Sequence, residues 1–297
     1  MNLLVTGASG FIGSALVPRL TAAGHSVRRL TRRTPAGPGE YRWDPPAGTI
    51  DPDALKGLDG AVHLAGETID GRWTAAKKAR ILSSRVDGTR ILSDALAALE
   101  PRPRVFVCAS AVGLYGDRGE EELTEASPPG DSFLAEVVKQ WEAASRPAQD
   151  AGVRVVRLRF GIVLSPRGGA LRRMLIPFRL GLGGRLGSGR QWVSWISLGD
   201  ALRAVEHAVA DDALAGAANA AAPNPVKNAE LTKALARVLR RPAILPVPVP
   251  VLRLVLGELA GELLASIRAS PERLAETGFE FADPELEPAL RRLLGRP

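Results

Sequence analysis

Short runs of aliphatic residues alternate with longer segments of helical periodicity through the first two thirds of the chain. The runs are nearly continuous rather than alternating with polar residues, which is typical of strands covered on both faces. They predict strands at 2–6, 26–30, 60–64, 104–109 and 153–159. Strands that alternate with helices predict an α/β fold, a Rossmann-type doubly wound parallel sheet with right-handed crossovers.

Three segments between these runs have the spacing of amphipathic helices, and they span 11–23, 73–99 and 133–151. In the second segment, apolar and small residues recur at steps of three and four, from Leu82 to Leu96. This spacing predicts one buried stripe along a long helix.

The character of the chain changes after about residue 165. Glycine and arginine dominate 165–192, proline recurs within 242–250, and the remainder is predicted to be helical. We therefore expect a Rossmann domain over 1–220 that includes a substrate loop at about 165–192. A smaller C-terminal domain, 221–297, is expected to pack over the carboxyl edge of the sheet.

Composition is that of an ordinary globular protein, with 297 residues, 45% hydrophobic and 24% charged. The single cysteine, Cys108, excludes a disulfide within the chain and a cysteine-rich metal site. The first residues lack a basic leader and a cleavage site, and the longest apolar run, 243–265, is interrupted by prolines and charges. These features predict a cytoplasmic protein that does not enter a membrane.

The net charge is +7, and most of the basic residues are arginines scattered among acidic residues. Because they form no basic block with interleaved aromatic residues, we expect no nucleic-acid partner. Binding of a polyanionic small molecule accounts for the charge more simply. The three histidines lack metal-ligand spacing, so no metal is expected. The sequence is compatible with a homodimer and does not determine the oligomeric state.

The first predicted strand runs into Gly7-Ala-Ser-Gly10-Phe-Ile-Gly13, which opens the first helix. Gly7 suits a tight turn, Gly10 lets the backbone approach a pyrophosphate, and Gly13 permits close packing of helix on strand. The start of the helix then offers unpaired N–H groups to the phosphates. A glycine pattern in this position predicts a dinucleotide site, the alternative being a tight turn without a ligand.

The end of the second strand indicates which dinucleotide binds. NAD-binding proteins carry an acidic residue there for the ribose 2′-hydroxyl, whereas this chain has Thr31, Arg32 and Arg33. Guanidinium groups match a 2′-phosphate, which a carboxylate would repel. This favours NADP(H) over NAD(H), although two solvated arginines on a basic protein are the alternative.

Several motifs resemble those of an extended short-chain dehydrogenase/reductase: TGASGFIGSAL, HLAGE, ASAVGLYG and SWISLGDALRA. Finer marks are GRWT at 71–74, SR at 84–85, PFRLGLGGRLGSGRQW and APNPVKNAE. With these marks the chain resembles the atypical subgroup called the epimerase family, which includes human family 39U proteins and bacterial sugar-nucleotide epimerases. The resemblance covers nearly the whole chain and implies an NADP(H)-dependent oxidoreductase or epimerase.

The resemblance also implies which positions contact NADP(H). They are Gly7, Gly10, Phe11, Ile12, Thr31, Arg32, Leu64, Ala65, Glu67, Arg85 and the backbone near Val163. We expect Arg85 on the exposed face of the long helix, from which it reaches the cofactor's phosphates or a carboxylate. The alternative for Arg85 is an ordinary surface partner of a residue one turn away.

The catalytic groups are harder to assign, because the Tyr-x-x-x-Lys pair of typical short-chain dehydrogenases is missing. On the expected helix Leu134 stands at the tyrosine position and Val138 at the lysine position. The candidates that remain for catalysis are Ser110, Glu67 and Lys139, with Tyr115 and Glu142 considered beside them. Ser110 ends a strand, so a capping role is the alternative. Glu142 is better explained as the buried helix partner of an arginine.

Substrate contacts are expected from the glycine-rich loop and from tryptophans near the cleft. Arg185 and Arg190 suit a phosphate or carboxylate, and Trp73 and Trp192 suit stacking on a ring, with core packing as the alternative. An anionic small-molecule substrate, such as a nucleotide sugar, follows by family analogy only. A catalytically inactive dinucleotide-binding protein with a regulatory or scaffold role is the competing hypothesis, since the tyrosine is absent.

Overall fold

The computed structural model describes residues 1–296, which fold around one eight-stranded sheet. In spatial order the strands are β12 (Gly216–Ala220), β8 (Arg154–Phe160), β6 (Val105–Ala111), β5 (Gly60–His63), β1 (Asn2–Thr6), β2 (Ser26–Thr31), β3 (Glu40–Asp44) and β4 (Thr49–Ile50). Neighbouring strands pair in parallel except β3 and β4, which are antiparallel. The predicted α/β, doubly wound parallel sheet is confirmed.

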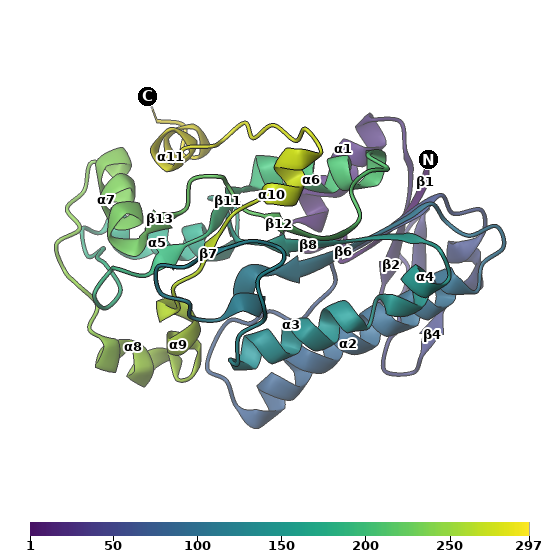
Figure 1. The fold of residues 1–297 in the computed structure, drawn as a ribbon, viewed down its shortest axis with the longest axis horizontal. Coiled ribbons are helices and arrows are strands. Elements are labelled where there is room, and N and C mark those ends of the chain that lie inside the picture. The colour runs from purple at the N-terminus through teal and green to yellow at the C-terminus, as the bar shows by residue number, and fades with distance from the viewer. Residues whose placement is uncertain (297) are drawn as a thin grey trace.

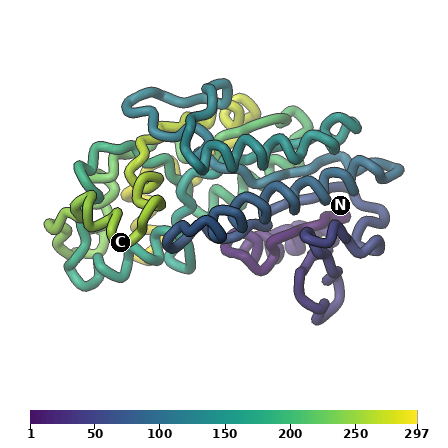
Figure 2. Tube along the Cα trace, turned by 90° about the horizontal axis from the view of Figure 1, so that it is seen from below, coloured from purple at the N-terminus to yellow at the C-terminus, as the bar shows by residue number. Residues whose placement is uncertain are grey.

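Helices cover both faces of the sheet (Figure 1). Helices α1 (Gly13–Ala22), α6 (Leu198–Ala210) and α10 (Glu272–Glu276) lie on one face, and α2 (Ala75–Ala97), α3 (Phe133–Ala143) and α4 (Arg146–Asp150) on the other. Figure 2 shows α2 and α3 side by side along the second face.

This arrangement explains the unbroken apolar runs. In β1, Leu3 and Val5 pack into the core beneath α1 and α6, while Leu4 between them packs against the α2 side. Both directions are buried, so the three central positions of the strand are all apolar.

All five predicted strands are present, with bounds that move by one or two residues. Strands β3, β4 and β12 of this sheet are not predicted by the hydrophobic pattern. Strand β12 has the sequence GAANA, which has little intrinsic preference for extended structure. It forms because its backbone completes the hydrogen bonds of β8, with Ala218 opposite Leu158.

The predicted helix over 133–151 is wrong as a single helix, because it is divided into α3 and α4. Ser145 lies at the break, where its hydroxyl donates to the carbonyl oxygen of Glu142 at 2.7 Å. The same hydroxyl accepts a hydrogen bond from Nε of Arg157, also at 2.7 Å. This side-chain anchoring and Pro147, at the start of α4, redirect the chain.

The remaining elements follow β8 or connect the main strands. They are η1 (Pro52–Leu55), η2 (Val112–Tyr115), β7 (Glu122–Leu123), β9 (Ile162–Leu164), α5 (Gly169–Arg179), β10 (Trp192–Val193), β11 (Trp195–Ser197), β13 (Val226–Lys227), α7 (Asn228–Leu239), α8 (Val249–Leu256), α9 (Leu259–Leu264), β14 (Arg268–Ala269) and α11 (Leu286–Leu293). Helices α5, α7, α8, α9 and α11 gather at one end of the molecule (Figure 1). One hydrophobic cluster there joins residues between 164 and 195 to residues between 222 and 294. Division of the chain after residue 220 stays a prediction.

Helices within residues 1–296 include none that is long and apolar enough to cross a membrane.

Candidate functional site

The glycine turn after β1 is closed by contacts that leave no room for side chains. Gly7 has a φ of +66°, and a Cβ there would lie 2.7 Å from the backbone of Leu64. A Cβ on Gly13 would lie 2.2 Å from the carbonyl oxygen of Gly7. Gly13 therefore lets the helix start approach the turn itself, and the amide of Gly10 donates to that same Gly7 oxygen at 2.8 Å.

The start of α1 presents free hydrogen-bond donors beside this turn. Among residues 1–296 the backbone N–H groups of Phe11 and Ile12 have no acceptor. They lie at the positive end of a ten-residue helix, which favours an anion such as a pyrophosphate.

Phe11 connects the glycine turn to the chain that follows β9. Its ring lies against Gly168 and Gly169, where a Cβ on Gly168 would come within 2.5 Å of Cδ2 of Phe11. The carbonyl oxygen of Val163 is 3.2 Å from where a Cβ of Gly169 would lie. Two predicted cofactor positions, Phe11 and Val163, are thus brought together at the start of α5. The glycine pair was not singled out in the sequence, although two successive glycines before a helix were a usable signal.

Thr6, at the end of β1, positions the backbone after β5. Its hydroxyl accepts hydrogen bonds from the amides of Leu64 and Ala65, both at 3.2 Å. Its own proton is therefore donated to Nδ1 of His63 at 2.7 Å. His63 is fully buried, and loss of hydration lowers its pKa to about 4, so it is neutral. Sequence reasoning missed Thr6, because no local pattern shows that the strand end after β5 depends on it.

Replacing Thr6 by valine is expected to lower the free energy of unfolding by about 1–3 kcal/mol, because the part-buried amide of Ala65 loses its acceptor and the amide of Leu64 keeps only the carbonyl oxygen of Thr6, at 3.3 Å. NADPH affinity should also fall, since Leu64 and Ala65 lose their anchor. Thr89→Val is a matched control: Thr89 is fully buried, and its hydroxyl has no partner within the described chain. Urea unfolding and calorimetric titration of both variants measure the two effects. Equal losses in the two variants would contradict the role of Thr6.

The loop after Ala65 is held from below by α2. Oγ of Ser84 accepts a hydrogen bond from the amide of Glu67 at 2.9 Å. Nη1 of Arg85 donates to the carbonyl oxygens of Glu67 and Ile81, both at 3.0 Å. The Ser-Arg pair at 84–85 is therefore a clamp on this loop.

Arg85 does not lie on an exposed helix face, so that expectation is wrong. Its guanidinium lies beneath Gly66, with Cζ 3.4 Å from where a Cβ of Gly66 would lie and 5.1 Å from the ring centroid of Trp141. Burial lowers its pKa to about 10, which still leaves it charged at neutral pH. The long helix turns this position toward α3, because α2 and α3 pack against each other.

Glu67 is an ionised group beside the predicted cofactor position. Its Oε1 accepts a hydrogen bond from Nζ of Lys77 at 2.8 Å, and this bond holds its pKa below the ordinary value. Arg32 adds a weaker attraction to the same carboxylate. Arg32 itself is exposed and forms no ion pair with any carboxylate among residues 1–296. Its charge is therefore available to a ligand.

Ser110 belongs to a buried network rather than to an open cleft. It is 3% exposed, and its hydroxyl donates to Oε1 of Glu142 at 2.6 Å. Glu142 also accepts two hydrogen bonds from Arg159, at 2.8 and 2.9 Å. Nη1 of Arg159 donates to the hydroxyl of Tyr115, which donates to Oδ1 of Asn219 at 2.7 Å. The interpretation of Glu142 as the buried partner of an arginine is confirmed.

The surroundings of this network keep Arg159 charged and Tyr115 neutral. Burial opposes the charge on Arg159, but the hydrogen bonds and attraction of Glu142 outweigh it and raise the pKa. Burial also raises the pKa of the Tyr115 hydroxyl, which is fully buried. Tyr115 is therefore a poor proton relay at neutral pH.

Helix α3 carries the last catalytic candidate, Lys139, together with Leu134 and Val138 at the tyrosine and lysine positions of typical short-chain dehydrogenases. Lys139 is exposed and pairs with Glu136 at 2.6 Å. Val138 is 3% exposed within an apolar cluster, and Leu134 lies near Gly113. Ser110, Glu67 and Lys139 form no direct contact with one another in the part of the chain that is described.

The two predicted substrate tryptophans are engaged by the protein itself. Nε1 of Trp73 donates to the carbonyl oxygen of Ile69 at 2.7 Å, and its ring is 7% exposed. Trp192 lies between Lys227 and Arg268, with centroid distances of 5.2 and 4.9 Å. Core packing accounts for Trp73, and cation–π contacts account for Trp192.

The two predicted anion-binding arginines lie in the glycine-rich segment after α5. Arg185 and Arg190 are both exposed and pair with no carboxylate among residues 1–296. Their role in substrate binding stays a prediction. Over the same residues, no group of three or more His, Cys, Asp or Glu side chains is placed to hold a metal ion.

Comparison with known proteins agrees with this geometry. Residues 3–221 match the NAD dependent epimerase/dehydratase family, and residues 247–293 match a domain of unknown function, DUF1731. Epimerase family protein Mb2239 of Mycobacterium bovis is 45% identical over 99% of this chain and 97% of that protein.

Two solved structures are similar over the whole chain. Human epimerase family protein SDR39U1 (isoform 2), crystallised with NADPH, is 36% identical over 100% of both chains, with a TM-score of 0.91. The nucleoside-diphosphate sugar epimerase of Corynebacterium glutamicum is 39% identical over 99% of this chain and 58% of that chain, with a TM-score of 0.83.

Proposed function

Because the chain belongs to the NAD dependent epimerase/dehydratase family, we propose that it binds NADP(H) and uses it as an oxidoreductase or epimerase on a small anionic substrate. The observation that carries the choice of cofactor is the exposed, unpaired Arg32 at the end of β2, where an NAD-binding protein carries an acidic residue. The NADPH in the human relative supports the same choice.

In this proposal the chain holds the dinucleotide in two places besides Arg32. The free amides of Phe11 and Ile12 bind the pyrophosphate. The backbone of Leu64 and Ala65, anchored by Thr6, lies against the ribose. Bound NADP(H) supplies hydride transfer, and the site's own groups orient the substrate and exclude water.

Proton transfer follows a different arrangement from that of typical short-chain dehydrogenases. The tyrosine and lysine positions of α3 are occupied by Leu134 and Val138, which are packed among apolar residues. Of the candidate groups, Glu67 follows the strand end that meets the cofactor. Its lowered pKa keeps the carboxylate ionised and makes it a weak base, so it suits a group that orients a hydroxyl and not one that donates a proton at neutral pH.

A regulatory dinucleotide-binding protein is the second candidate function. The apolar side chains of Leu134 and Val138 and the engaged hydroxyl of Ser110 favour it. Both hypotheses require NADP(H) binding, so turnover is what separates them.

The test offers the protein nucleotide sugars and carbonyl compounds with NADPH or NADP⁺. Nicotinamide absorbance reports a net redox reaction. An epimerase returns its hydride to the sugar and leaves no net change in nicotinamide absorbance, so formation of the epimeric sugar is followed by NMR in parallel. Turnover by either readout supports the enzyme. Tight NADPH binding without turnover across the panel supports the regulatory protein.

Ser110→Ala tests the catalytic role of the strand-end serine. We expect the free energy of unfolding to fall by about 1.5–3 kcal/mol, because the buried carboxylate of Glu142 loses a donor. A substrate-binding hydroxyl predicts a different result, with kcat lowered roughly ten- to a thousandfold and stability unchanged. Chemical unfolding and steady-state kinetics on the same preparation decide between these outcomes.

A further inference from the structure

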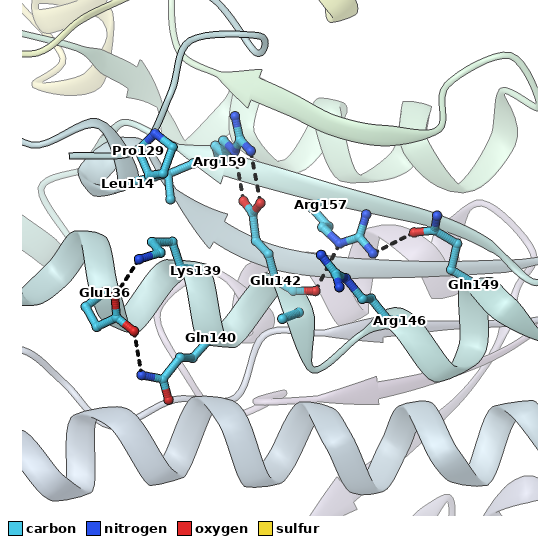
Figure 3. Close-up of a pocket in the computed structure, with 11 residues that line it drawn as sticks. Leu114, Pro129, Glu136, Lys139, Gln140, Glu142, Arg146, Gln149, Arg157 and Arg159 are labelled. Carbon is cyan, nitrogen blue, oxygen red and sulfur yellow. Dashed lines mark hydrogen bonds and ion pairs between the residues drawn. The ribbon is translucent and has the colours of Figure 1, made fainter. Parts of the chain in front are cut away.

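A cavity of about 590 Å³ lies beside α3 and α4, and we call it the basic groove. Its floor is formed by side chains of β8, and its walls come from α3, α4 and the loop that contains Pro129 (Figure 3). None of the positions that the sequence assigns to NADP(H) lines it.

The charges of the basic groove do not balance. Four cationic side chains line it against two carboxylates, those of Glu136 and Glu142. Glu136 is paired with Lys139 at 2.6 Å, and Glu142 is bound through two hydrogen bonds by Arg159. Arg146 and Arg157 remain without a carboxylate partner over residues 1–296.

Arg157 is the more buried of these two unpaired arginines. Its hydrogen bonds go only to neutral oxygens: the carbonyl of Glu142, the hydroxyl of Ser145 and the amide of Gln149. Burial removes hydration from the guanidinium and lowers its pKa; attraction from the Glu142 carboxylate opposes this change without cancelling it, and repulsion from Arg146 adds to it. Charge held in a partly dry site without a directly paired counterion is costly. An anion between the two guanidiniums relieves both costs.

Arg146 is suited to capture such an anion. It is exposed, has no protein partner in the described chain, and lies beside Arg157 at the end of α3 (Figure 3). Two neighbouring guanidiniums suit the oxygens of a phosphate, which planar N–H groups bind in pairs. Leu114 and Pro129 lie together in another part of the groove, away from Arg146 and Arg157 (Figure 3).

We propose that the basic groove binds a phosphorylated small molecule, with its phosphate between Arg146 and Arg157 and its organic part against Leu114 and Pro129. The volume is within the usual range for small-molecule sites, roughly 300–1,000 Å³. This site is separate from the dinucleotide site and does not depend on the reaction that the protein catalyses.

The test uses phenyl phosphate as a probe with a phosphate and an apolar ring, and inorganic phosphate as the charge alone. Calorimetric titrations of the full chain are run with and without saturating NADPH, so that binding at the glycine turn is recognised by competition. We expect phenyl phosphate to bind more tightly than inorganic phosphate, and NADPH to leave both affinities unchanged. Benzyl alcohol, an uncharged ring, should not bind detectably.

Arg146→Gln removes one of the two guanidiniums without removing a hydrogen bond within the protein. We expect it to weaken phenyl phosphate binding about tenfold, the lower end for a charge-assisted contact. Arg90→Gln is the matched control, because Arg90 is exposed on α2 and outside the groove. It removes the same charge and should leave the affinity unchanged.

Three results would overturn the proposal. The first is a dissociation constant for phenyl phosphate above roughly 10 mM, which corresponds to a binding free energy weaker than about −3 kcal/mol. The second is an equal loss in Arg146→Gln and Arg90→Gln, which would mean a general surface-charge effect. The third is displacement of phenyl phosphate by NADPH, which would place the probe in the dinucleotide site.

Discussion

Replacing Gly10 by valine is expected to abolish NADPH binding while leaving the protein folded. A Cβ at this position lies 3.1 Å from the carbonyl oxygen of Gly7, close to the limit of ordinary contacts. The branched methyl groups extend beyond it, over the turn that the pyrophosphate approaches. Loss of two or more charge-assisted hydrogen bonds, each about 1.5–3 kcal/mol, corresponds to at least about a hundredfold in affinity.

The stability of the Gly10 variant should fall only modestly, because Gly10 is exposed in a surface turn. Gly261→Val serves as the control, since a Cβ there meets nothing within 4 Å. Gly13→Val is unsuitable for this test, because its Cβ at 2.2 Å from a backbone oxygen would disturb the turn itself. Unchanged NADPH affinity in the Gly10 variant, measured by calorimetry, would remove the dinucleotide-site assignment.

Replacing Arg32 by aspartate is expected to reverse the cofactor preference. A charge-assisted contact to the 2′-phosphate contributes about 1.5–3 kcal/mol, or roughly ten- to over a hundredfold in affinity. Arg32→Asp should weaken NADPH binding by at least that factor, because it removes attraction and adds repulsion. NADH binding should change little or improve slightly, since aspartate accepts from the 2′-hydroxyl.

Two controls separate a specific contact from a general charge effect. Arg33→Asp makes the same charge change one residue away, where the amide of Arg33 donates to Oγ1 of Thr31 at 3.2 Å. It should affect NADPH less than Arg32→Asp. Added salt should weaken NADPH binding to the unaltered protein more than NADH binding. Equal binding of both cofactors by the unaltered protein would show that Arg32 is only a solvated surface charge.

The amino-acid pattern was enough to predict the five central strands of the sheet and the glycine turn after β1. Leu3, Leu4 and Val5 are all apolar because both faces of a central parallel strand are buried. A strand at this position can therefore be predicted without a structure. The roles of Gly7 and Gly13 can also be predicted, since only glycine leaves room for the backbone segments that contact each other in this turn. These signals are local, and each depends on a few neighbouring residues.

The hydrogen-bond partners of the polar side chains, by contrast, depend on the tertiary structure. The proton of Ser110 goes to Glu142, which is 32 positions away and lies on α3. Arg85 became a clamp on the loop at Glu67 because α3 covers it, and no periodicity within α2 shows that. Arg146 and Arg157 share a groove because Ser145 ends α3 above β8. Each of these partners comes from another element, so its chemistry is fixed by packing between elements rather than by the residues beside it in the chain.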